Sequence, residues 1–298
     1  MNAELETKLR AAGLDPQAVD GLVRTALAED GGKDVTSEPI FGYTATGRAD
    51  MVARQPGVVA GLPVAELVFA SVTAVDYFLE IGGDLKVVTR VEDGSRVAPG
   101  DVLLTVEGPL VPLLRAERTA LNFLTHLSGV ATLTRQWADA IAHTKARVRD
   151  TRKTLPGLRA LQKYAVRCGG GVNHRMSLAD AALIKDNHVA AAGSVTAAFT
   201  AVTAPGLHVQ VECDTLDQVR EALAAGAGSI LLDNMSVAEM TEAVRLTEGR
   251  AELEASGGLT LDGAHAVAET GVDYLAVGAL THSAQALDIG LDLLTAGT

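Results

Sequence analysis

The sequence predicts an α/β protein in two parts, a small N-terminal α+β domain followed by a C-terminal α/β barrel. Two observations lead to this fold class. Residues 46–107 alternate β-rich segments with turn signals, whereas from residue 146 onward short apolar strands alternate with amphipathic helices. Repeated strand–helix units require parallel strands joined by right-handed crossovers, and such a sheet closes readily into a barrel.

The N-terminal part begins with a helical pattern over residues 3–30, in which leucine and valine recur at helical spacing. Residues 46–59 and 85–107 then read as strands, with Asp-Gly and Pro-Gly turn signals among them. A helix is expected between these strands, over residues 65–72.

A long helix is predicted over residues 113–143, with Leu121, Leu124 and Leu127 on one apolar stripe and a candidate kink at Gly129. Six strands follow, over residues 146–149, 181–184, 209–211, 229–232, 251–253 and 274–277. Helices near residues 157–167, 194–202, 215–225, 237–247 and 260–270 separate them. The tail, residues 282–298, is expected to be helical and to return to the first domain.

Length and composition exclude several classes of protein. The 298 residues are 48% hydrophobic, which is ample for a core, yet no apolar run approaches the roughly 18 residues of a membrane span. The N-terminus lacks the apolar segment of a signal peptide. The two cysteines, Cys168 and Cys213, fit a reducing cytoplasm and argue against a zinc site or a disulfide framework. We therefore expect a cytoplasmic protein.

The cations of the chain are concentrated in one window. Residues 145–185 hold ten lysines and arginines against two aspartates, a local balance of +8 in a chain of net charge −12, so the remainder sums to −20. Such a window predicts a pocket that concentrates a small, highly charged anion, while the acidic remainder repels nucleic acid.

Charged residues or glycines follow each of the six predicted strands, where the reactive groups of α/β barrels lie. In order, these strand ends are Asp150-Thr151-Arg152-Lys153, Lys185-Asp186-Asn187-His188, Glu212-Cys213-Asp214, Asp233-Asn234, Glu254-Ala255-Ser256-Gly257-Gly258 and Gly278-Ala279. One such end is more often structural than functional, but the whole set predicts an active site.

The two glycine-bearing ends, Ser256-Gly257-Gly258 and Val277-Gly278-Ala279, belong to the last two strands. The late loops of these barrels commonly bind phosphate, because glycine lets backbone N–H groups approach an oxyanion; a plain turn is the alternative.

Glu212 and Asp233 project from neighbouring strands, where carboxylates suit ribose hydroxyls or Mg²⁺. The alternative is that they only neutralise nearby cations such as Lys185.

His174 and Arg175 follow a glycine-rich loop, residues 168–173. An arginine fork, a histidine donor and Lys185 would together hold a small dicarboxylate. Arg159, Lys163 and Arg167 recur at helical spacing, so we interpret them as a solvated face or a partner contact rather than as site residues.

At these residues the chain resembles the quinolinate phosphoribosyltransferase family, also called nicotinate-nucleotide pyrophosphorylase (carboxylating), among type II phosphoribosyltransferases. The matching runs are EDGGKDVTS (29–37), ERTALNFLTHLSGVAT (117–132), DTRKTLPGLRALQKYAVRCGGGVNHRMSLADAALIKDNH (150–188), VECDTLDQ (211–218), ILLDNM (230–235), EASGGLT (254–260) and GVDYLAVGALTHS (271–283). The chain has Cys213 where the family usually has valine, a small change that puts no role in doubt.

The resemblance implies an N-terminal α/β sandwich over residues 1–115, joined by the tail 282–298, and an incomplete α/β barrel over residues 116–281. It implies phosphoribosyl transfer from phosphoribosyl pyrophosphate to quinolinate with decarboxylation, giving nicotinate mononucleotide, pyrophosphate and CO₂ in de novo NAD biosynthesis. Mg²⁺ is the expected cofactor. A homodimer is expected, with a higher oligomer left open, in which Arg118 reaches into the partner's site.

The resemblance also assigns site residues. Those implied for quinolinate are Arg118 from the partner, Thr151, Arg152, His174, Arg175 and Lys185. Those implied for phosphoribosyl pyrophosphate are Lys153, Glu212, Asp233, Ser256, Gly257, Gly258, Val277, Gly278 and Ala279. Lys153, Glu212 and Asp233 are the expected catalytic residues, and Glu212 and Asp233 are candidate Mg²⁺ ligands.

Three other functions remain as alternatives. The chain could transfer phosphoribose to another aromatic acid, or act as a Schiff-base aldolase through Lys153 or Lys185, whose neighbouring cations could activate it. A nucleic-acid binder is the third, and 3% aromatic content weighs against it.

Overall fold

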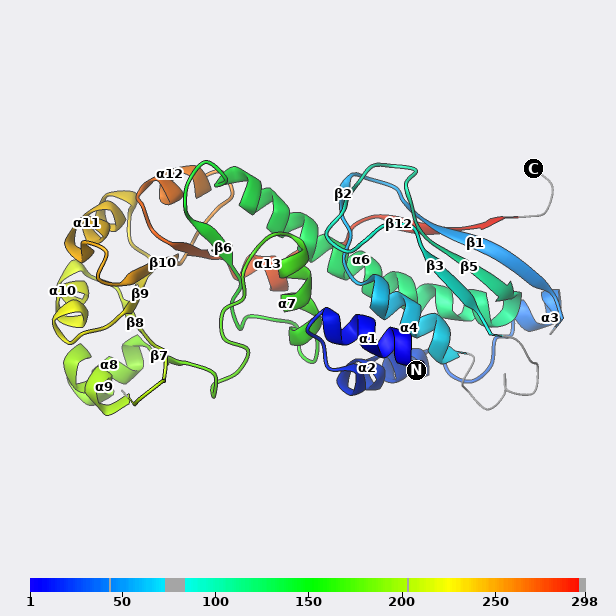
Figure 1. The fold of residues 1–298 in the computed structure, drawn as a ribbon, viewed down its shortest axis with the longest axis horizontal. Coiled ribbons are helices and arrows are strands. Elements are labelled where there is room, and N and C mark those ends of the chain that lie inside the picture. The colour runs from blue at the N-terminus through cyan, green and yellow to red at the C-terminus, as the bar shows by residue number, and fades with distance from the viewer. Residues whose placement is uncertain (43, 73–83, 203, 295–298) are drawn as a thin grey trace. The chain divides into compact units, whose positions relative to one another are not determined.

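The computed structural model describes residues 1–42, 44–72, 84–202 and 204–294, which form two compact units. The first unit comprises Met1–Leu133, Pro156–Gly169 and Ala284–Thr298, and the second comprises Thr134–Leu155 and Gly170–Ser283. The first contains an antiparallel sheet and the second a parallel one, so the predicted α/β class in two parts is confirmed (Figure 1). The predicted boundary at residue 116 stays a prediction.

The sheet of the first unit has the strand order β12-β1-β5-β3. Its strands are β1 (Thr46–Ala53), β3 (Lys86–Thr89), β5 (Val102–Pro109) and β12 (Ile289–Leu294), and a two-residue pair, β2 (Gly57–Val58) with β4 (Arg96–Val97), lies apart. The strands predicted around residues 46–59 and 85–107 are confirmed.

The helical prediction for the tail was wrong, because residues 289–294 form strand β12. Met51 of β1 pairs with Leu291 in antiparallel register. Ile289, Leu291 and Leu293 alternate with Gly290 and Asp292, a period of two that suits a strand, and β12 satisfies the backbone groups on one side of β1. Residues 295–298 of the predicted tail lie outside the described part of the chain.

The predicted helical opening is two helices, α1 (Ala3–Ala11) and α2 (Pro16–Glu29). Gly13, at φ +72°, ends the first, and the Asp15 side chain caps the second by accepting from the Gln17 N–H at 3.0 Å. The short helix α3 (Ser37–Phe41) follows.

Helix α4 (Leu62–Val72) confirms the prediction at residues 65–72. It begins three residues earlier than predicted, where the Asp93 carboxylate accepts from the N–H groups of Gly61 and Leu62 at 2.9 and 3.1 Å.

The long helix is α6 (Leu110–Ala140), and it is unbroken at Gly129. A Cβ at this glycine would overlap the carbonyl oxygen of Gln285. Gly129 therefore permits close packing of the tail segment and is not a kink.

The sheet of the second unit consists of β6 (Arg147–Arg149), β7 (Ala182–Ile184), β8 (Val209–Cys213), β9 (Ser229–Asp233), β10 (Glu252–Ser256) and β11 (Tyr274–Ala276). The strands are parallel in the order β6-β11-β10-β9-β8-β7, and each overlaps a predicted strand. The first strand, β6, pairs with the last, β11, as in a barrel, but no pairing of β6 with β7 joins the described strands. The ring is open between these two strands.

Helices lie on the outer side of this curved sheet (Figure 1). They are α8 (Asp186–Ala192), α9 (Val195–Val202), α10 (Leu216–Ala224), α11 (Val237–Thr247) and α12 (Ala264–Glu269). The short helix α13 (Ala279–His282) follows β11. Val211, Ile230 and Leu232, which share one face of this sheet, are fully buried. None of the described helices meets the length and hydropathy needed to cross a membrane.

The helix predicted near residues 157–167 is α7 (Arg159–Cys168), which belongs to the first unit. The interpretation of its cations as a solvated face was wrong for Lys163, and the alternative of a partner contact stays a prediction. Lys163 is fully buried and Arg159 is half-buried, while Arg167 is exposed. Helical spacing places these residues on one face but does not say what covers that face.

Candidate active site

A pocket of about 410 Å³ opens at the carboxyl ends of the parallel strands in the second unit. It is lined by Thr151, Arg152, Lys153, His174, Arg175, Leu183, Lys185, Glu212, Leu231, Asp233, Glu254, Ser256 and Ala276. Because parallel strands end at the same edge of a sheet, residues from all six strand ends meet here. The predicted convergence of these residues is therefore found in the structure.

Arg152, Arg175 and Lys185 supply the cationic wall of the pocket. The Arg175 Nη1 donates to the Ala181 carbonyl at 2.8 Å, and burial together with the nearby Arg152 lowers the pKa of the Arg175 guanidinium. The Arg152 Nε is buried and has no hydrogen-bond partner among the described residues. A buried, unpaired guanidinium donor is costly unless a ligand oxygen meets it, so this wall suits a carboxylate.

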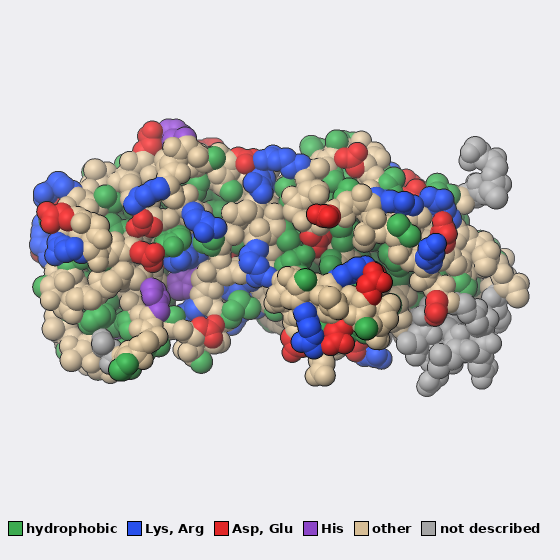
Figure 2. Space-filling view, in the orientation of Figure 1, with side chains coloured by type: hydrophobic (Ala, Val, Ile, Leu, Met, Phe, Trp, Pro, Cys, Tyr) green, Lys and Arg blue, Asp and Glu red, His purple; other side chains and the backbone are tan. Residues whose placement is uncertain are grey.

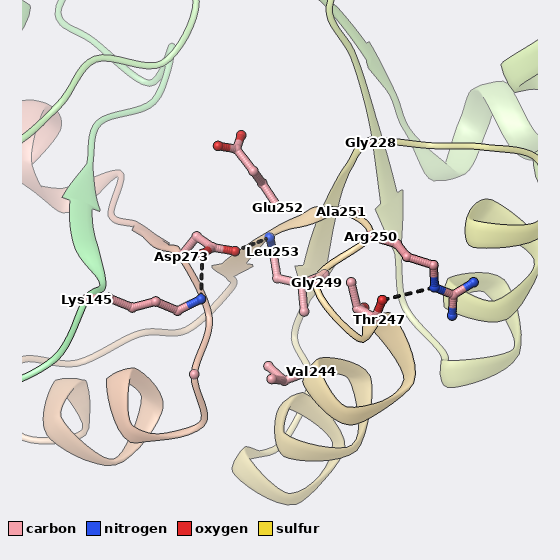
Figure 3. Close-up of a pocket in the computed structure, with 11 residues that line it drawn as sticks. Lys145, Gly228, Val244, Thr247, Gly249, Arg250, Ala251, Glu252, Leu253 and Asp273 are labelled. Carbon is pink, nitrogen blue, oxygen red and sulfur yellow. Dashed lines mark hydrogen bonds and ion pairs between the residues drawn. The ribbon is translucent and has the colours of Figure 1, made fainter.

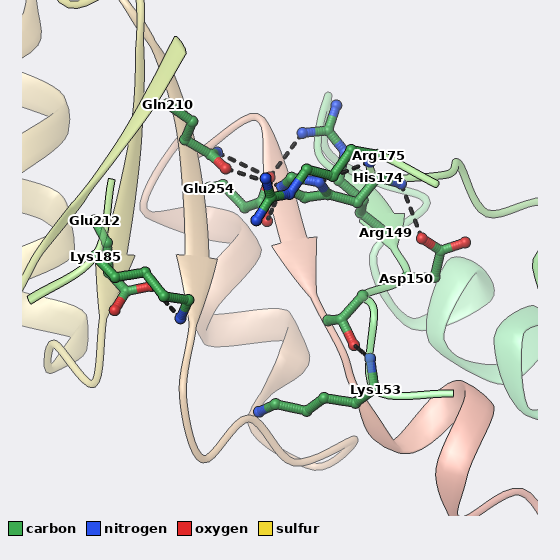
Figure 4. Close-up of polar contacts among 10 residues, drawn as sticks. Arg149, Asp150, Lys153, His174, Arg175, Lys185, Gln210, Glu212 and Glu254 are labelled. Atoms are coloured by element: carbon green, nitrogen blue, oxygen red, sulfur yellow. Dashed lines mark hydrogen bonds and ion pairs between the residues drawn. The ribbon is translucent and has the colours of Figure 1, made fainter. Parts of the chain in front are cut away.

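A buried polar network lies behind this wall (Figure 4). Glu254, 1% exposed, accepts from Arg149 Nη1 at 2.7 Å and from Gln210 Nε2 at 3.2 Å. Gln210 Oε1 lies 2.9 Å from His174 Nε2, and the Arg175 backbone N–H donates to His174 Nδ1 at 2.8 Å.

The network fixes the protonation of His174. An ionised Glu254 can only accept, so the amide nitrogen of Gln210 faces it and the amide oxygen faces His174. His174 must then carry its proton on Nε2, while Nδ1 accepts from the Arg175 N–H. Both ring nitrogens have partners within the protein, and Nδ1 of His174 holds the Arg175 backbone in place. The predicted contact of His174 with quinolinate stays a prediction.

Asp150 ends β6 and is fully buried. It accepts from the His174 backbone N–H at 2.8 Å and from the Asn173 side chain. Asp150 therefore anchors the loop that carries His174 and Arg175, and its role is structural.

Glu212 and Asp233 both line the pocket. Lys185 Nζ lies 2.9 Å from Glu212 Oε2, so this carboxylate does neutralise a cation, as one alternative held. Asp233 Oδ2 accepts from the Asn234 side chain at 2.6 Å. Figure 4 shows Lys153 extending toward the Lys185–Glu212 pair. Two carboxylates beside one pocket are hard oxygen donors of the kind Mg²⁺ prefers, so these residues fit the expected ion.

Backbone conformation and close neighbours explain the glycines in these two loops. Gly257 and Gly258 have φ of +87° and +60°, and a Cβ on Gly257 would overlap the Asn234 side chain. At Gly278 a Cβ would lie 3.1 Å from Lys153 Cδ and 3.2 Å from His282 Nε2. Absence of a side chain at Gly278 thus lets Lys153 and His282 lie close to this loop.

Val277 does not fit its predicted role as a phosphate ligand. Its side chain is 3% exposed and its N–H donates to the Arg149 carbonyl at 2.9 Å. This amide is already satisfied, so Val277 packs beneath the loop, and the remaining candidates there are Gly278 and Ala279. His282, which the sequence prediction did not single out, also lies beside this loop, and its Thr-His-Ser run was part of the resemblance.

Arg118 lies on α6 in the first unit, where it is exposed and lines a groove with Asn122 and His126. It is not among the residues that line the pocket of the second unit. Its predicted role in a partner's site stays a prediction.

A second hollow, of about 370 Å³, lies at the opposite ends of the same strands (Figure 3). Lys145, Asp273 and Arg250, three of its four charged residues, are engaged within the protein. Lys145 Nζ lies 2.7 Å from Asp273 Oδ1, Asp273 Oδ2 accepts from the Leu253 N–H, and Arg250 donates to the Thr247 carbonyl. These contacts are structural, as is usual at the amino-terminal edge of such sheets.

A parallel α/β sheet whose carboxyl edge presents cations, carboxylates and glycine loops has the architecture of an α/β enzyme with its active site at that edge. The family "Quinolinate phosphoribosyl transferase, N-terminal domain" matches residues 34–128, and its "C-terminal domain" matches residues 130–292. The chain belongs to the quinolinate phosphoribosyltransferase family. The predicted family and enzyme class are thereby confirmed.

Curated relatives agree with this assignment. The chain is 54% identical over 278 residues to the nicotinate-nucleotide pyrophosphorylase [carboxylating] of Mycobacterium leprae, covering 91% of this chain and 95% of that protein. It is 39% identical to a probable nicotinate-nucleotide pyrophosphorylase [carboxylating] of Bacillus subtilis, with 90% of both chains covered.

Solved structures agree as well. The nicotinate-nucleotide pyrophosphorylase of Francisella tularensis is similar with a TM-score of 0.87 at 36% identity, covering 93% of this chain and 96% of that one. NadC of Streptococcus pyogenes gives 0.87 at 38% identity, with 95% and 99% covered. The two-part fold is therefore that of solved members of the family.

Proposed function

We propose that the pocket of the second unit binds quinolinate beside phosphoribosyl pyrophosphate and catalyses decarboxylating phosphoribosyl transfer between them. The overall activity is the one that the curated relatives' names state, and it belongs to de novo NAD synthesis. One observation carries the assignment to this pocket. The buried Arg152 Nε, unpaired among the described residues, stands with Arg175 and Lys185 in a pocket that also holds two carboxylates.

The quinolinate subsite is formed by Arg152, Arg175 and Lys185. A planar guanidinium matches a carboxylate through two parallel hydrogen bonds, and Lys185 adds a point charge. Thr151 begins the same loop and orders it by accepting from the Lys153 N–H at 3.0 Å. His174 positions Arg175. Arg118 of a second copy would complete the acceptor pocket in a homodimer.

The phosphoribosyl pyrophosphate subsite is formed by groups on the neighbouring strand ends. Lys153 faces the pyrophosphate, and Glu212 and Asp233 orient the ribose hydroxyls. The backbone of Ser256, Gly257, Gly258, Gly278 and Ala279 receives the 5′-phosphate, because these loops leave N–H groups accessible to an oxyanion.

The reaction begins when the quinolinate nitrogen attacks C1 of the ribose and the C1–O bond to pyrophosphate breaks. Lys153 stabilises the departing pyrophosphate, and the carboxylates of Glu212 and Asp233 offset positive charge that develops at C1. Bound Mg²⁺, held by Glu212 and Asp233 or by the pyrophosphate itself, would neutralise part of the leaving group's charge. Alignment of a weak nucleophile with C1 could supply on the order of 7–11 kcal/mol.

Decarboxylation follows because the ring nitrogen is now quaternary. The electron pair of the bond to the 2-carboxylate moves into the cationic ring as CO₂ leaves, and a proton from solvent then replaces the carboxylate. The product is nicotinate mononucleotide. The part played by the protein is to hold the ring in place while excluding alternative acceptors.

Turnover of quinolinate tests this assignment. The chain is supplied with quinolinate, phosphoribosyl pyrophosphate and Mg²⁺, and CO₂ and nicotinate mononucleotide are measured, with nicotinate as the control acceptor. We expect equimolar products from quinolinate alone. Turnover of nicotinate without quinolinate would overturn the substrate, and a lysine adduct trapped by borohydride would favour an aldolase. Lys185 is ion-paired with Glu212, whereas a Schiff-base lysine needs a neutral amine.

We also place the chain in the cytoplasm, on the ground that Cys168 and Cys213 are both free thiols.

A further inference from the structure

Two histidines and a glutamate meet on the surface of the second unit, away from the residues that line its active-site pocket. His265 and Glu269 lie on α12, and His143 lies in the turn between α6 and β6. One ligand atom from each lies within 4.8 Å of the other two. Figure 2 shows histidine side chains with an acidic side chain beside them at the surface over α12.

The helix accounts for two of these ligands. His265 and Glu269 are four positions apart in the sequence, so they lie on the same face of α12 one turn apart, with His265 Nδ1 3.4 Å from Glu269 Oε2. A histidine and a carboxylate at this spacing can bind one ion together, as paired helical ligands do in many metalloproteins.

The third ligand comes from a segment that is distant in the sequence. The His143 ring stacks on the His265 ring with centroids 4.1 Å apart and an angle of 17° between their planes. Stacked rings of this kind bring the ring nitrogens close without engaging them in a mutual hydrogen bond. A rotation of exposed side chains, which occurs in picoseconds to nanoseconds, would turn a nitrogen of each ring toward a shared ion.

The nearby lysine does not account for the position of Glu269 in this cluster. Lys145, two residues from His143, is held by Asp273 at 2.7 Å, so it is engaged elsewhere. His265 and Glu269 are 60% and 57% exposed, which leaves room for an ion and for the water molecules that would complete its coordination.

We propose that His143, His265 and Glu269 form a binding site for a late first-row transition metal ion such as Zn²⁺. Two imidazoles and one carboxylate with open positions suit Zn²⁺, Ni²⁺ or Co²⁺, whereas Mg²⁺ prefers oxygen ligands and keeps its water. The bound ion would join the turn before β6 to the helix before β11, which are neighbouring strands of the sheet.

Calorimetric titration of the tag-free chain with ZnCl₂ tests the site. Excess Mg²⁺ is present so that carboxylates of the active-site pocket are occupied by the oxygen-preferring ion. We expect one Zn²⁺ per chain, with affinity reduced at least tenfold in His265→Ala and in His143→Ala. His208→Ala removes an exposed histidine outside the cluster and is the matched control, which should bind Zn²⁺ as the unaltered chain does.

Cobalt substitution supplies a second readout that is independent of activity. The absorption of bound Co²⁺ in the visible region should appear with the unaltered chain and disappear in His265→Ala. Circular dichroism without metal shows whether each variant is folded. Unchanged Zn²⁺ affinity in folded His265→Ala, equal loss in His208→Ala, or a thiolate charge-transfer band that assigns the ion to a cysteine would each overturn the proposal.

Discussion

Glu254→Gln removes one buried charge from behind the active-site pocket while keeping the shape of the side chain. Glu254 is 1% exposed and Arg149, its partner at 2.7 Å, is 16% exposed. Loss of one partner from a buried ion pair costs about 3–5 kcal/mol, because the other charge stays buried. The glutamine oxygen can still accept from Arg149, so we expect the free energy of unfolding to fall by about 2–3 kcal/mol.

The same change should alter His174. A glutamine at position 254 can donate or accept, so Gln210 no longer has one preferred orientation and His174 no longer has reason to keep its proton on Nε2. Nitrogen NMR of the ring should show the Nε2–H form in the unaltered chain and a mixture of tautomers in the variant. Weakening of the hydrogen bond that positions Arg175 should raise the KM for quinolinate about five-fold, which corresponds to about 1 kcal/mol.

Glu252→Gln is the matched control, because Glu252 lies on the same strand and is exposed. It should leave the unfolding free energy, the His174 tautomer and the KM for quinolinate unchanged. A proton on Nδ1 of His174 in the unaltered chain would refute the account of this network. An unchanged free energy of unfolding in Glu254→Gln would also refute it.

Three further predictions concern Arg175, Arg118 and Cys213. Arg175→Ala should weaken quinolinate binding by about 2–5 kcal/mol in a calorimetric titration, and unchanged affinity would exclude Arg175 from the acceptor pocket. Arg118→Ala should be inactive alone and regain partial activity when mixed with Lys185→Ala; absence of complementation would place Arg118 in its own subunit's site. Burial raises the pKa of Cys213 to about 12, so the native thiol should resist alkylation at pH 8. Since the unfolded thiol releases its proton from about pH 8.5, stability should fall as pH rises above that value, which chemical denaturation measures.

The parallel sheet could be predicted because its strands are short apolar runs with helices between them, and such strands have one arrangement that buries both faces. The convergence of Arg152, Lys185, Glu212 and Asp233 followed from that topology, because residues directly after parallel strands share an edge.

Other features depended on contacts that the local pattern does not contain. Gln210 and Glu254 lie inside apolar strands, and their pairing with His174 requires the register of neighbouring strands and the course of a separate loop. The tail has residues that suit either a helix or a strand, and its pairing with β1 decides between them. Lys163 is buried because of what covers α7, which helical spacing does not reveal.

Binding of quinolinate and nicotinate to the unaltered chain and to Arg152→Ala tests the central assignment most directly, because nicotinate lacks the carboxylate that is lost in the reaction. We predict a strong preference of the unaltered chain for quinolinate, most of which disappears in Arg152→Ala. An undiminished preference in that variant would show that this cationic wall does not bind the second carboxylate.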